Sequence, residues 1–289
     1  MVDLFIKSIK EKIDQRLLEL ISYKGGLEKT LFDAVQYFQT GSAKRVRPLL
    51  VLATVSNFNG SIAKAIDPAC AIELVHSYSL IHDDLPCMDD DNLRRGKPTL
   101  HKKYSEAIAV LTGDYFLTHA FEVLSMAKGL TERQIISLIQ VLSKSAGASG
   151  MIGGQVVDIE SENKEIDFKT LQYMHEKKTG ALFECSVKFG AVICHLGEEK
   201  INSLSLFAKY LGFAFQVIDD LLDVIKNTKE LGKPAHSDEK NQKTTTVTLL
   251  GIEESKRLAQ KLAKQAIDVL PKECLCLKKI AQKLLEKAF

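Results

Sequence analysis

Two stretches of the sequence gather carboxylates in a way that suits the binding of metal ions. The first, "LIHDDLPCMDDDNLRRGKPT" from Leu80 to Thr99, is rich in aspartate and is closed by cationic residues. The second is "LGFAFQVIDDLLDVIKN", from Leu211 to Asn227. Carboxylate oxygens without nearby thiolate or imidazole pairs suit Mg²⁺, which usually keeps waters and bridges to a phosphate. An EF-hand calcium loop is excluded, because its acids alternate and it ends on a bidentate glutamate.

The second stretch predicts one stripe of carboxylates on a buried helix. Its polar residues are Gln216, Asp219, Asp220 and Asp223. Spaced at i, i+3, i+4 and i+7, they share one face of a helix that is otherwise apolar almost all round. Buried carboxylates are prohibitively costly without cations, and a metal ion is the natural cation. Lysines from a neighbouring helix are the alternative partners.

A proline explains how the aspartates of the first stretch could come together. On a straight helix, Asp83 and Asp89 would not share a face. Pro86 removes an N–H group and clashes with a carbonyl of the preceding turn, so we expect the helix to end or bulge near Leu85. The chain can then swing Asp89 back beside Asp83 and Asp84. This predicts a second carboxylate cluster at a helix C-terminus.

Cationic residues near these acids indicate a site for a polyanion such as a diphosphate. One group follows the first acidic stretch directly: Arg94, Arg95 and Lys97. A second group precedes a helix that we expect to begin near Pro48: Lys44, Arg45 and Arg47. Two lysines in the loop after the second acidic stretch could close as a lid: Lys233 and Lys243. Adjacent arginines and helix N-terminal N–H groups bind phosphates well, although a solvated run of charge is the alternative for each group.

The elements that must position these residues are helices. Glycine and proline are sparse, at 17 and 6 residues, and apolar residues recur at i, i+3, i+4 and i+7, as in "IISLIQVLSKSAG". The breaks between the helices are short polar loops rather than interdomain linkers. We therefore predict an all-α protein with a single domain, residues 1–289, built as one bundle of about a dozen helices.

Composition excludes several classes of protein. The 289 residues carry a net charge of +2, so nothing global points to nucleic acid or to a membrane surface. We see no apolar run that approaches the roughly 20 residues needed to span a bilayer, and we predict no membrane span. The N-terminus has no apolar core of a signal peptide. Six scattered cysteines without a CxxC pair suit reduced thiols and predict a cytoplasmic protein.

Together the motifs resemble those of the trans-type polyprenyl diphosphate synthases, and most closely the bacterial farnesyl and geranylgeranyl diphosphate synthases. "HDDLPCMDDDNLRRGKPTLH" looks like their first aspartate-rich motif, with two residues inserted before the final aspartate, and "FQVIDDLLDV" looks like their second. "AKRVRP", "GGQVVDI", "KKTGALFE" and the lid's "GK" and "KTT" extend the resemblance over about residues 40 to 250. The chain departs from the family at Val247, where a proline is usual. The resemblance implies a bundle of the isoprenoid synthase type, with the active-site cavity between the helices that carry the two motifs.

The resemblance also implies a reaction and its residues. The reaction is a Mg²⁺-dependent head-to-tail (1'-4) condensation of isopentenyl diphosphate with an allylic diphosphate, dimethylallyl or geranyl, in a homodimer with three magnesium ions. The implied metal ligands are Asp83, Asp84, Asp89, Asp219 and Asp223. Arg94 would grip the allylic diphosphate, and the positions that bind isopentenyl diphosphate are matched by Lys44, Arg47, His76 and Arg95. The residues that match catalytic positions near the reacting carbons are Lys178, Thr179 and Gln216, and the lid lysines are matched by Lys233 and Lys243.

Tyr78 and Ser79 are expected to set the length of the product. At 1.5 Å per residue, they lie about 6 to 8 Å along the helix axis from Asp83. In the resembling family an aromatic residue at the position of Tyr78 goes with a fifteen-carbon product, and a small residue or methionine with twenty carbons. We therefore expect (2E,6E)-farnesyl diphosphate. The alternative for Tyr78 is an ordinary aromatic residue of the core.

Other functions compete with this interpretation. A geranylgeranyl diphosphate synthase is the nearest alternative. A terpene cyclase or a non-catalytic synthase subunit is disfavoured by the second basic group and by two intact acidic motifs. A phosphohydrolase would need further histidines near the His82–Asp83 pair, and a metal-storage bundle would show Glu-x-x-His pairs.

Overall fold

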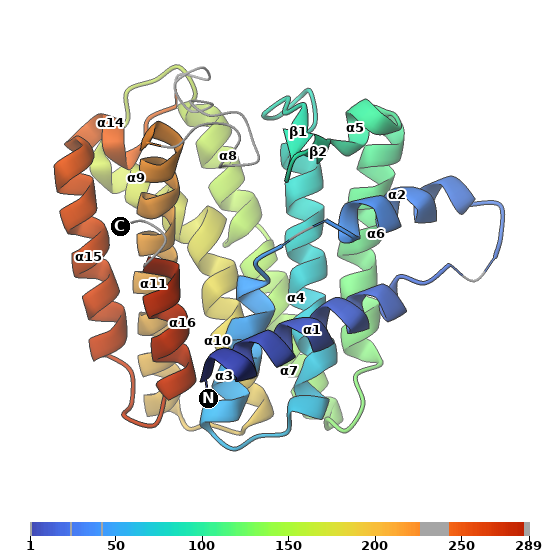
Figure 1. The fold of residues 1–289 in the computed structure, drawn as a ribbon, viewed down its shortest axis with the longest axis horizontal. Coiled ribbons are helices and arrows are strands. Elements are labelled where there is room, and N and C mark those ends of the chain that lie inside the picture. The colour runs from blue at the N-terminus through green and yellow to red at the C-terminus, as the bar shows by residue number, and fades with distance from the viewer. Residues whose placement is uncertain (1, 24, 42, 226–242, 286–289) are drawn as a thin grey trace.

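The computed structural model describes residues 2–23, 25–41, 43–225 and 243–285, and almost every element in it is a helix (Figure 1). The first helices are α1 (Val2–Leu20), α2 (Lys29–Gln39), α3 (Val46–Asn57), α4 (Ile62–Asp83), α5 (Leu100–Lys103), α6 (Glu106–Ser125) and α7 (Glu132–Ala146). They are followed by α8 (Met151–Ser161), α9 (Phe168–His175), the π-helical turn η1 (Glu176–Gly180), α10 (Ala181–Ile193), α11 (Glu198–Ile225), α14 (Thr246–Leu250), α15 (Ile252–Asp268) and α16 (Leu275–Leu285). Two short strands, β1 (Leu93–Arg94) and β2 (Lys97–Pro98), pair antiparallel. The predicted all-α class is confirmed.

Two long helices bring the acidic stretches to the same end of the bundle. Helix α4 packs against α3, α6 and α10, and α11 packs against α10, α15 and η1. In Figure 1 both helices rise toward the end where the strands, α8 and α14 gather. Because each acidic stretch lies at the C-terminal end of its helix, the two stretches meet there although they are far apart in the sequence.

Helix α4 ends where the aspartates begin. Its last residue is Asp83, and the N–H of Asp84 still donates to the carbonyl of Leu80. Pro86 follows within a turn. The N–H of Asp89 then donates to the carbonyl of Asp83, at 2.9 Å. The predicted return of the chain toward Asp83 is therefore confirmed.

The two strands form a hairpin whose turn consists of Arg95 and Gly96. Both residues have positive φ, 54° and 75°. This is the backbone of a type I′ turn, whose twist matches that of two antiparallel strands. Glycine adopts positive φ without steric cost, whereas arginine does not. The hairpin carries Arg94 to the end of α4, where its guanidinium contacts Asp84.

A buried ion network ties α1 to α3 and α4. Arg45 lies directly before α3, which begins at Val46, two residues before Pro48, and its side chain is buried. Its guanidinium donates to Asp14 and to Glu73, each at 2.8 Å. Without Arg45, the buried carboxylate of Glu73 would lose its compensating charge. Arg45 therefore has a structural role in the bundle.

Three helical segments are long and apolar enough to cross a membrane by length and composition, contrary to our reading that no run approaches this length. They are Glu106–Ser125, Glu132–Ser161 and Glu198–Ile225. The second contains the turn between α7 and α8, and the third is α11, which carries the acidic stripe and packs against α10 and α15. The absence of a membrane span stays a prediction.

Candidate active site

A cavity of about 290 Å³ lies between the ends of α4 and α11. It is also lined by α8, η1 and the segment from Lys243 to Thr245. The sequence-predicted site residues that line it are Arg47, His76, Ser79, Asp83, Asp89, Arg94, Lys178, Thr179, Gln216, Asp219 and Lys243. The predicted residues outside the lining are Lys44, Tyr78, Asp84, Arg95 and Asp223. The predicted lid residue Lys233 lies outside the described residues.

The first acidic stretch supplies Asp83 and Asp89 to the cavity wall and keeps Asp84 behind it. Asp83 accepts a hydrogen bond from the Gln155 amide on α8, and burial raises the pKa of Asp83. Asp84 is buried, and its carboxylate accepts hydrogen bonds from Nε and Nη2 of Arg94 at 2.6 to 2.8 Å. Burial raises the pKa of Asp84 to about 6, although Arg94 acts in the opposite direction. From the sequence, Asp84 is expected to bind a metal ion and Arg94 the allylic diphosphate, so their pairing is not predicted.

The acidic stripe of α11 divides between the cavity and the core. Gln216, Asp219 and Asp220 line the cavity, whereas Asp223 is buried outside the lining. Asp220 accepts the Gln216 amide at 3.1 Å and the backbone N–H of Thr246 at 2.8 Å. Burial raises the pKa of Asp220 to about 6 despite these hydrogen bonds. Asp220 therefore holds the start of α14 against α11.

Helix α8 contributes Gln155 and Asp158 to the cavity. Neither residue was predicted from the sequence as a site residue. They are three positions apart in "GGQVVDI", so they share one helix face. Asp158 accepts Nζ of Lys178 at 2.6 Å, and Nζ of Lys243 lies 3.7 Å away. Burial would raise the pKa of Asp158, but these two lysines lower it overall. The signal that could have found both residues is this spacing of an amide and an acid.

Lys178 and Thr179 are presented by η1, the π-helical turn between α9 and α10. Such turns are rare and often lie at functional sites. Burial lowers the pKa of Lys178, but Asp158 and the aspartates of the first stretch raise it overall, so the ammonium group stays charged. Thr179 Oγ1 donates to Gln216 Oε1 at 3.0 Å. The turn thus brings a charged group and a hydroxyl to the same cavity.

A glycine on α8 allows η1 to approach this closely. A Cβ atom at Gly154 would lie 2.3 Å from the backbone nitrogen of Lys178, which cannot rotate away. We expect Gly154→Ala to separate α8 from η1 and to lower the free energy of unfolding by about 1–3 kcal/mol. Product formation should also fall, because the contact between Lys178 and Asp158 would lengthen.

Thermal unfolding and steady-state turnover check this prediction. The matched control is Gly197→Ala, because a Cβ atom at Gly197 would meet nothing within 4 Å. If both variants unfolded at the wild-type temperature, the close approach of α8 and η1 would be wrong.

The residues predicted to bind isopentenyl diphosphate lie in and beside the cavity. Arg47 and His76 line it, and the Arg47 guanidinium lies 5.3 Å from the ring centre of Phe183. Nε of Arg47 is buried without a hydrogen-bond partner among the described residues, and burial lowers the pKa of Arg47 to about 10. Burial also lowers the pKa of His76 well below its usual value, so its imidazole is neutral. A buried guanidinium N–H group without a hydrogen-bond partner destabilises the fold, and an anionic ligand would provide the missing acceptor. Lys44 lies over the ring of Phe215, which lines the cavity, and Arg95 lies over the ring of Phe38, although neither cation is itself part of the lining.

The carboxylates of the cavity fit Mg²⁺ that is bridged to a diphosphate. Within the described ranges, no three Asp, Glu, His or Cys side chains form a group that could hold an ion by themselves. Mg²⁺ needs no such group, because it is usually held by one or two carboxylates, waters and substrate phosphates. Asp83, Asp89 and Asp219 offer hard oxygen ligands to one cavity. Burial raises the pKa of Asp83 even though the nearby Lys178 lowers it, so the charge of Lys178 does not fully offset the cost of burying this carboxylate. A divalent metal ion would supply the additional positive charge.

Lys243 already neutralises part of this acidic surface. Its Nζ lies 2.6 Å from Asp89 and 3.7 Å from Asp158. The sequence leaves lysines of a neighbouring helix as the alternative to metal for the acidic stripe of α11, and the structure pairs lysines with two other acids of this site, Asp89 and Asp158. Lysines and metal therefore need not exclude each other at this site.

Comparisons with known proteins find similar sequences and similar structures. The family model for polyprenyl synthetases matches residues 28–284. The chloroplastic geranylgeranyl pyrophosphate synthase of Catharanthus roseus is 43% identical over 242 residues, which cover 83% of this chain and 68% of the relative. The farnesyl diphosphate synthase of Bacillus subtilis is 39% identical over 254 residues, covering 87% of this chain and 86% of the relative. The crystal structure of a Helicobacter pylori geranyltransferase with magnesium and isoprenyl diphosphate has a TM-score of 0.88 at 35% identity, covering 98% of this chain and 96% of that one.

Proposed function

Because the chain belongs to the polyprenyl synthetase family and is a trans-prenyltransferase that joins isopentenyl diphosphate head-to-tail to an allylic diphosphate, we propose that its main product is (2E,6E)-farnesyl diphosphate. The observation that carries the site assignment is one cavity in which aspartates from two helices face Arg94, Lys178 and Lys243. Cations of this kind bind diphosphates, and the carboxylates bind them through Mg²⁺. The Helicobacter pylori geranyltransferase was crystallised with magnesium. For this chain we propose three ions, as the resemblance implies.

The proposed metal ligands are Asp83, Asp84, Asp89, Asp219 and Asp223. For Asp84 to reach an ion, Arg94 must leave it for the allylic diphosphate. This exchange preserves the bidentate geometry of the guanidinium, since a phosphate accepts the same pair of N–H groups as a carboxylate. Binding of the allylic substrate would therefore release Asp84 for the ion.

Ionisation of the allylic diphosphate produces an anionic leaving group at one end of the cavity and a carbocation at the other, and each needs a different environment. Bound Mg²⁺ supplies charge neutralisation at the departing diphosphate. The ammonium groups of Lys178 and Lys243, which neighbouring carboxylates hold in place, add positive charge at the same end. At the other end, the Lys178 carbonyl, the Thr179 hydroxyl and the Gln216 amide would meet the carbocation as dipoles while water is excluded.

We propose that the released diphosphate removes the final proton. The side chains assigned to the reacting carbons, Thr179 and Gln216, are neutral and hydrogen-bonded to each other. His76 lines the cavity, but its low pKa makes it a weak base.

Helix α4 carries the proposed limit on product length. Ser79 lines the cavity one turn before Asp83, and the adjacent Tyr78 is buried with its ring 5.1 Å from that of His82. We propose that a prenyl chain growing past Ser79 meets the phenol of Tyr78. The twenty-carbon product stays the alternative, because the Catharanthus roseus relative is named a geranylgeranyl pyrophosphate synthase.

Tyr78→Ala tests this limit. Removal of the phenol should deepen the cavity and shift the main product from fifteen to twenty carbons, as measured by mass spectrometry. Tyr115→Ala, on the neighbouring helix α6, is the matched control and should leave the product unchanged. An unaltered fifteen-carbon product from Tyr78→Ala would remove Tyr78 from this role without affecting the reaction.

We also propose a homodimer in the cytoplasm. Large apolar side chains are exposed along α6, α7 and α8, among them Leu111, Ile136, Ile152 and Val156. Exposed apolar surface of this kind is typical of faces that another subunit covers. All six cysteines are free, which suits a reducing compartment.

A further inference from the structure

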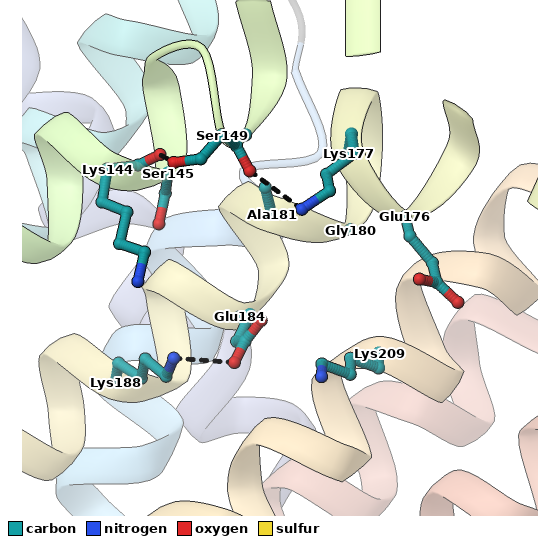
Figure 2. Close-up of a pocket in the computed structure, with 11 residues that line it drawn as sticks. Lys144, Ser145, Ser149, Glu176, Lys177, Gly180, Ala181, Glu184, Lys188 and Lys209 are labelled. Atoms are coloured by element: carbon teal, nitrogen blue, oxygen red, sulfur yellow. Dashed lines mark hydrogen bonds and ion pairs between the residues drawn. The ribbon is translucent and has the colours of Figure 1, made fainter. Parts of the chain in front are cut away.

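A second cavity lies beside η1 and is separate from the candidate active site. We call it the outer cavity; its volume is about 250 Å³, and it lies among α7, the turn before α8, η1, α10 and α11 (Figure 2). The residues of η1 divide between the two cavities. Lys177 and Gly180 line the outer cavity, whereas Lys178 and Thr179 line the active-site cavity. The two cavities share no lining residue, so they are separate sites joined by one turn of backbone.

Lysines outnumber acids in the outer cavity. The lining lysines are Lys144, Lys177, Lys188 and Lys209, and the lining acids are Glu176 and Glu184. Glu184 pairs with Lys188 at 2.7 Å. Glu176 accepts the amide of Gln172 at 2.8 Å. Among the described residues, no ion pair with a carboxylate is formed by Lys144, Lys177 or Lys209. The outer cavity therefore has an excess of positive charge.

The donors of the outer cavity converge on one space. Figure 2 shows the side chains of Lys144, Lys188 and Lys209 reaching toward the region beside Glu184. Lys177 donates to the carbonyl of Ser149 at 3.0 Å and keeps further N–H groups for a ligand.

The start of α8 adds backbone donors at the edge of the outer cavity. Gly150, which lines the cavity, precedes the helix and offers no side-chain cap. The first N–H groups of α8 are therefore left for water or for an anion, at the positive end of the helix dipole. Lysines and a helix N-terminus together favour a phosphate-type ligand.

We propose that the outer cavity binds inorganic diphosphate, the second product of prenyl transfer. A diphosphate spreads its charge over many oxygens and can pair with several separated ammonium groups, whereas one carboxylate would leave most of them unpaired. The volume equals that of roughly eight liquid waters, which is enough for this anion. Ser145 and Ser149 also line the cavity and add polar side chains to its lysines. The proposal rests on the transferase activity and not on the length of the product.

Equilibrium dialysis with radiolabelled inorganic diphosphate tests the proposal. We expect the double variant K144A/K209A to bind one diphosphate fewer per chain than the wild-type protein. The matched control K261A/K264A removes two exposed lysines of α15 and should bind as the wild type does. Product formation should persist in both variants, because none of these lysines lines the active-site cavity. Loss of binding with intact product formation thus separates this site from the catalytic one.

Equal binding by K144A/K209A and the wild type would overturn the proposal, whatever product the enzyme makes. Circular dichroism verifies folding, and K144Q/K209Q replaces the alanine pair if that variant unfolds. The same comparison with geranyl diphosphate distinguishes the source of the anion. If only geranyl diphosphate lost a binding site in the double variant, the outer cavity would select a prenyl chain and the assignment to inorganic diphosphate would be wrong.

Discussion

Asp83→Asn should lower the turnover of prenyl transfer by about 10³-fold while the protein stays folded. The amide keeps the size of the side chain and can still contact Gln155 on α8, but it removes the charge that faces the cavity. Burial raises the pKa of Asp83, which means that its charge is already unfavourable to folding. Loss of that charge should therefore reduce catalysis without reducing the free energy of unfolding.

A steady-state assay with isopentenyl and geranyl diphosphates at saturating Mg²⁺ measures this effect. The matched control is Asp90→Asn, because Asp90 belongs to the same loop but is exposed and does not line the active-site cavity. Asparagine also tolerates its positive φ of 46°. Near-wild-type turnover of Asp83→Asn would remove Asp83 from the metal site, and an equal loss in both variants would trace the effect to the shape of the loop.

Lys178→Met should lower turnover by about 10²-fold and also destabilise the fold. Methionine keeps the backbone carbonyl and most of the side-chain length but loses the ammonium group. Among the described residues, Asp158 would then form an ion pair with Lys243 alone, at 3.7 Å, and its buried charge would become costly. The variant thus separates the ammonium of Lys178, which we assign to the diphosphate, from its carbonyl, which we assign to the carbocation.

The double variant Lys178→Met/Asp158→Asn should recover stability but not turnover, since it removes the uncompensated carboxylate without restoring the cation. Lys177→Met is the control on the same π-helical turn, and it should retain product formation because Lys177 lines only the outer cavity. Wild-type turnover of Lys178→Met would mean that only the carbonyl of Lys178 contributes.

Local sequence chemistry was sufficient to predict much of the site. Pro86 predicted where α4 ends and that Asp89 returns toward Asp83, because a proline interrupts the helix by its own geometry. The i, i+3, i+4 spacing placed Gln216 and Asp219 on one face, since that face follows from the helix period alone. Both inferences concern residues within a few turns of each other.

The features that the sequence did not predict depend on contacts between distant elements. Lys44, Arg45 and Arg47 read as one basic group, yet Arg45 is directed into the bundle because Asp14 and Glu73 lie on helices that pack beside it. The pairing of Arg94 with Asp84 depends on the hairpin turn, and the role of Asp158 depends on how closely α8 approaches η1. No periodicity within a single segment contains this information.

Product analysis tests the central claim most directly. Purified protein would be incubated with Mg²⁺, isopentenyl diphosphate and either dimethylallyl or geranyl diphosphate, and the products identified by mass. We predict a fifteen-carbon prenyl diphosphate from both primers, which would support the proposed cavity and Tyr78 as its limit. A twenty-carbon main product would contradict the assigned product and the role of Tyr78, and no elongation of either primer would contradict the assigned active site itself.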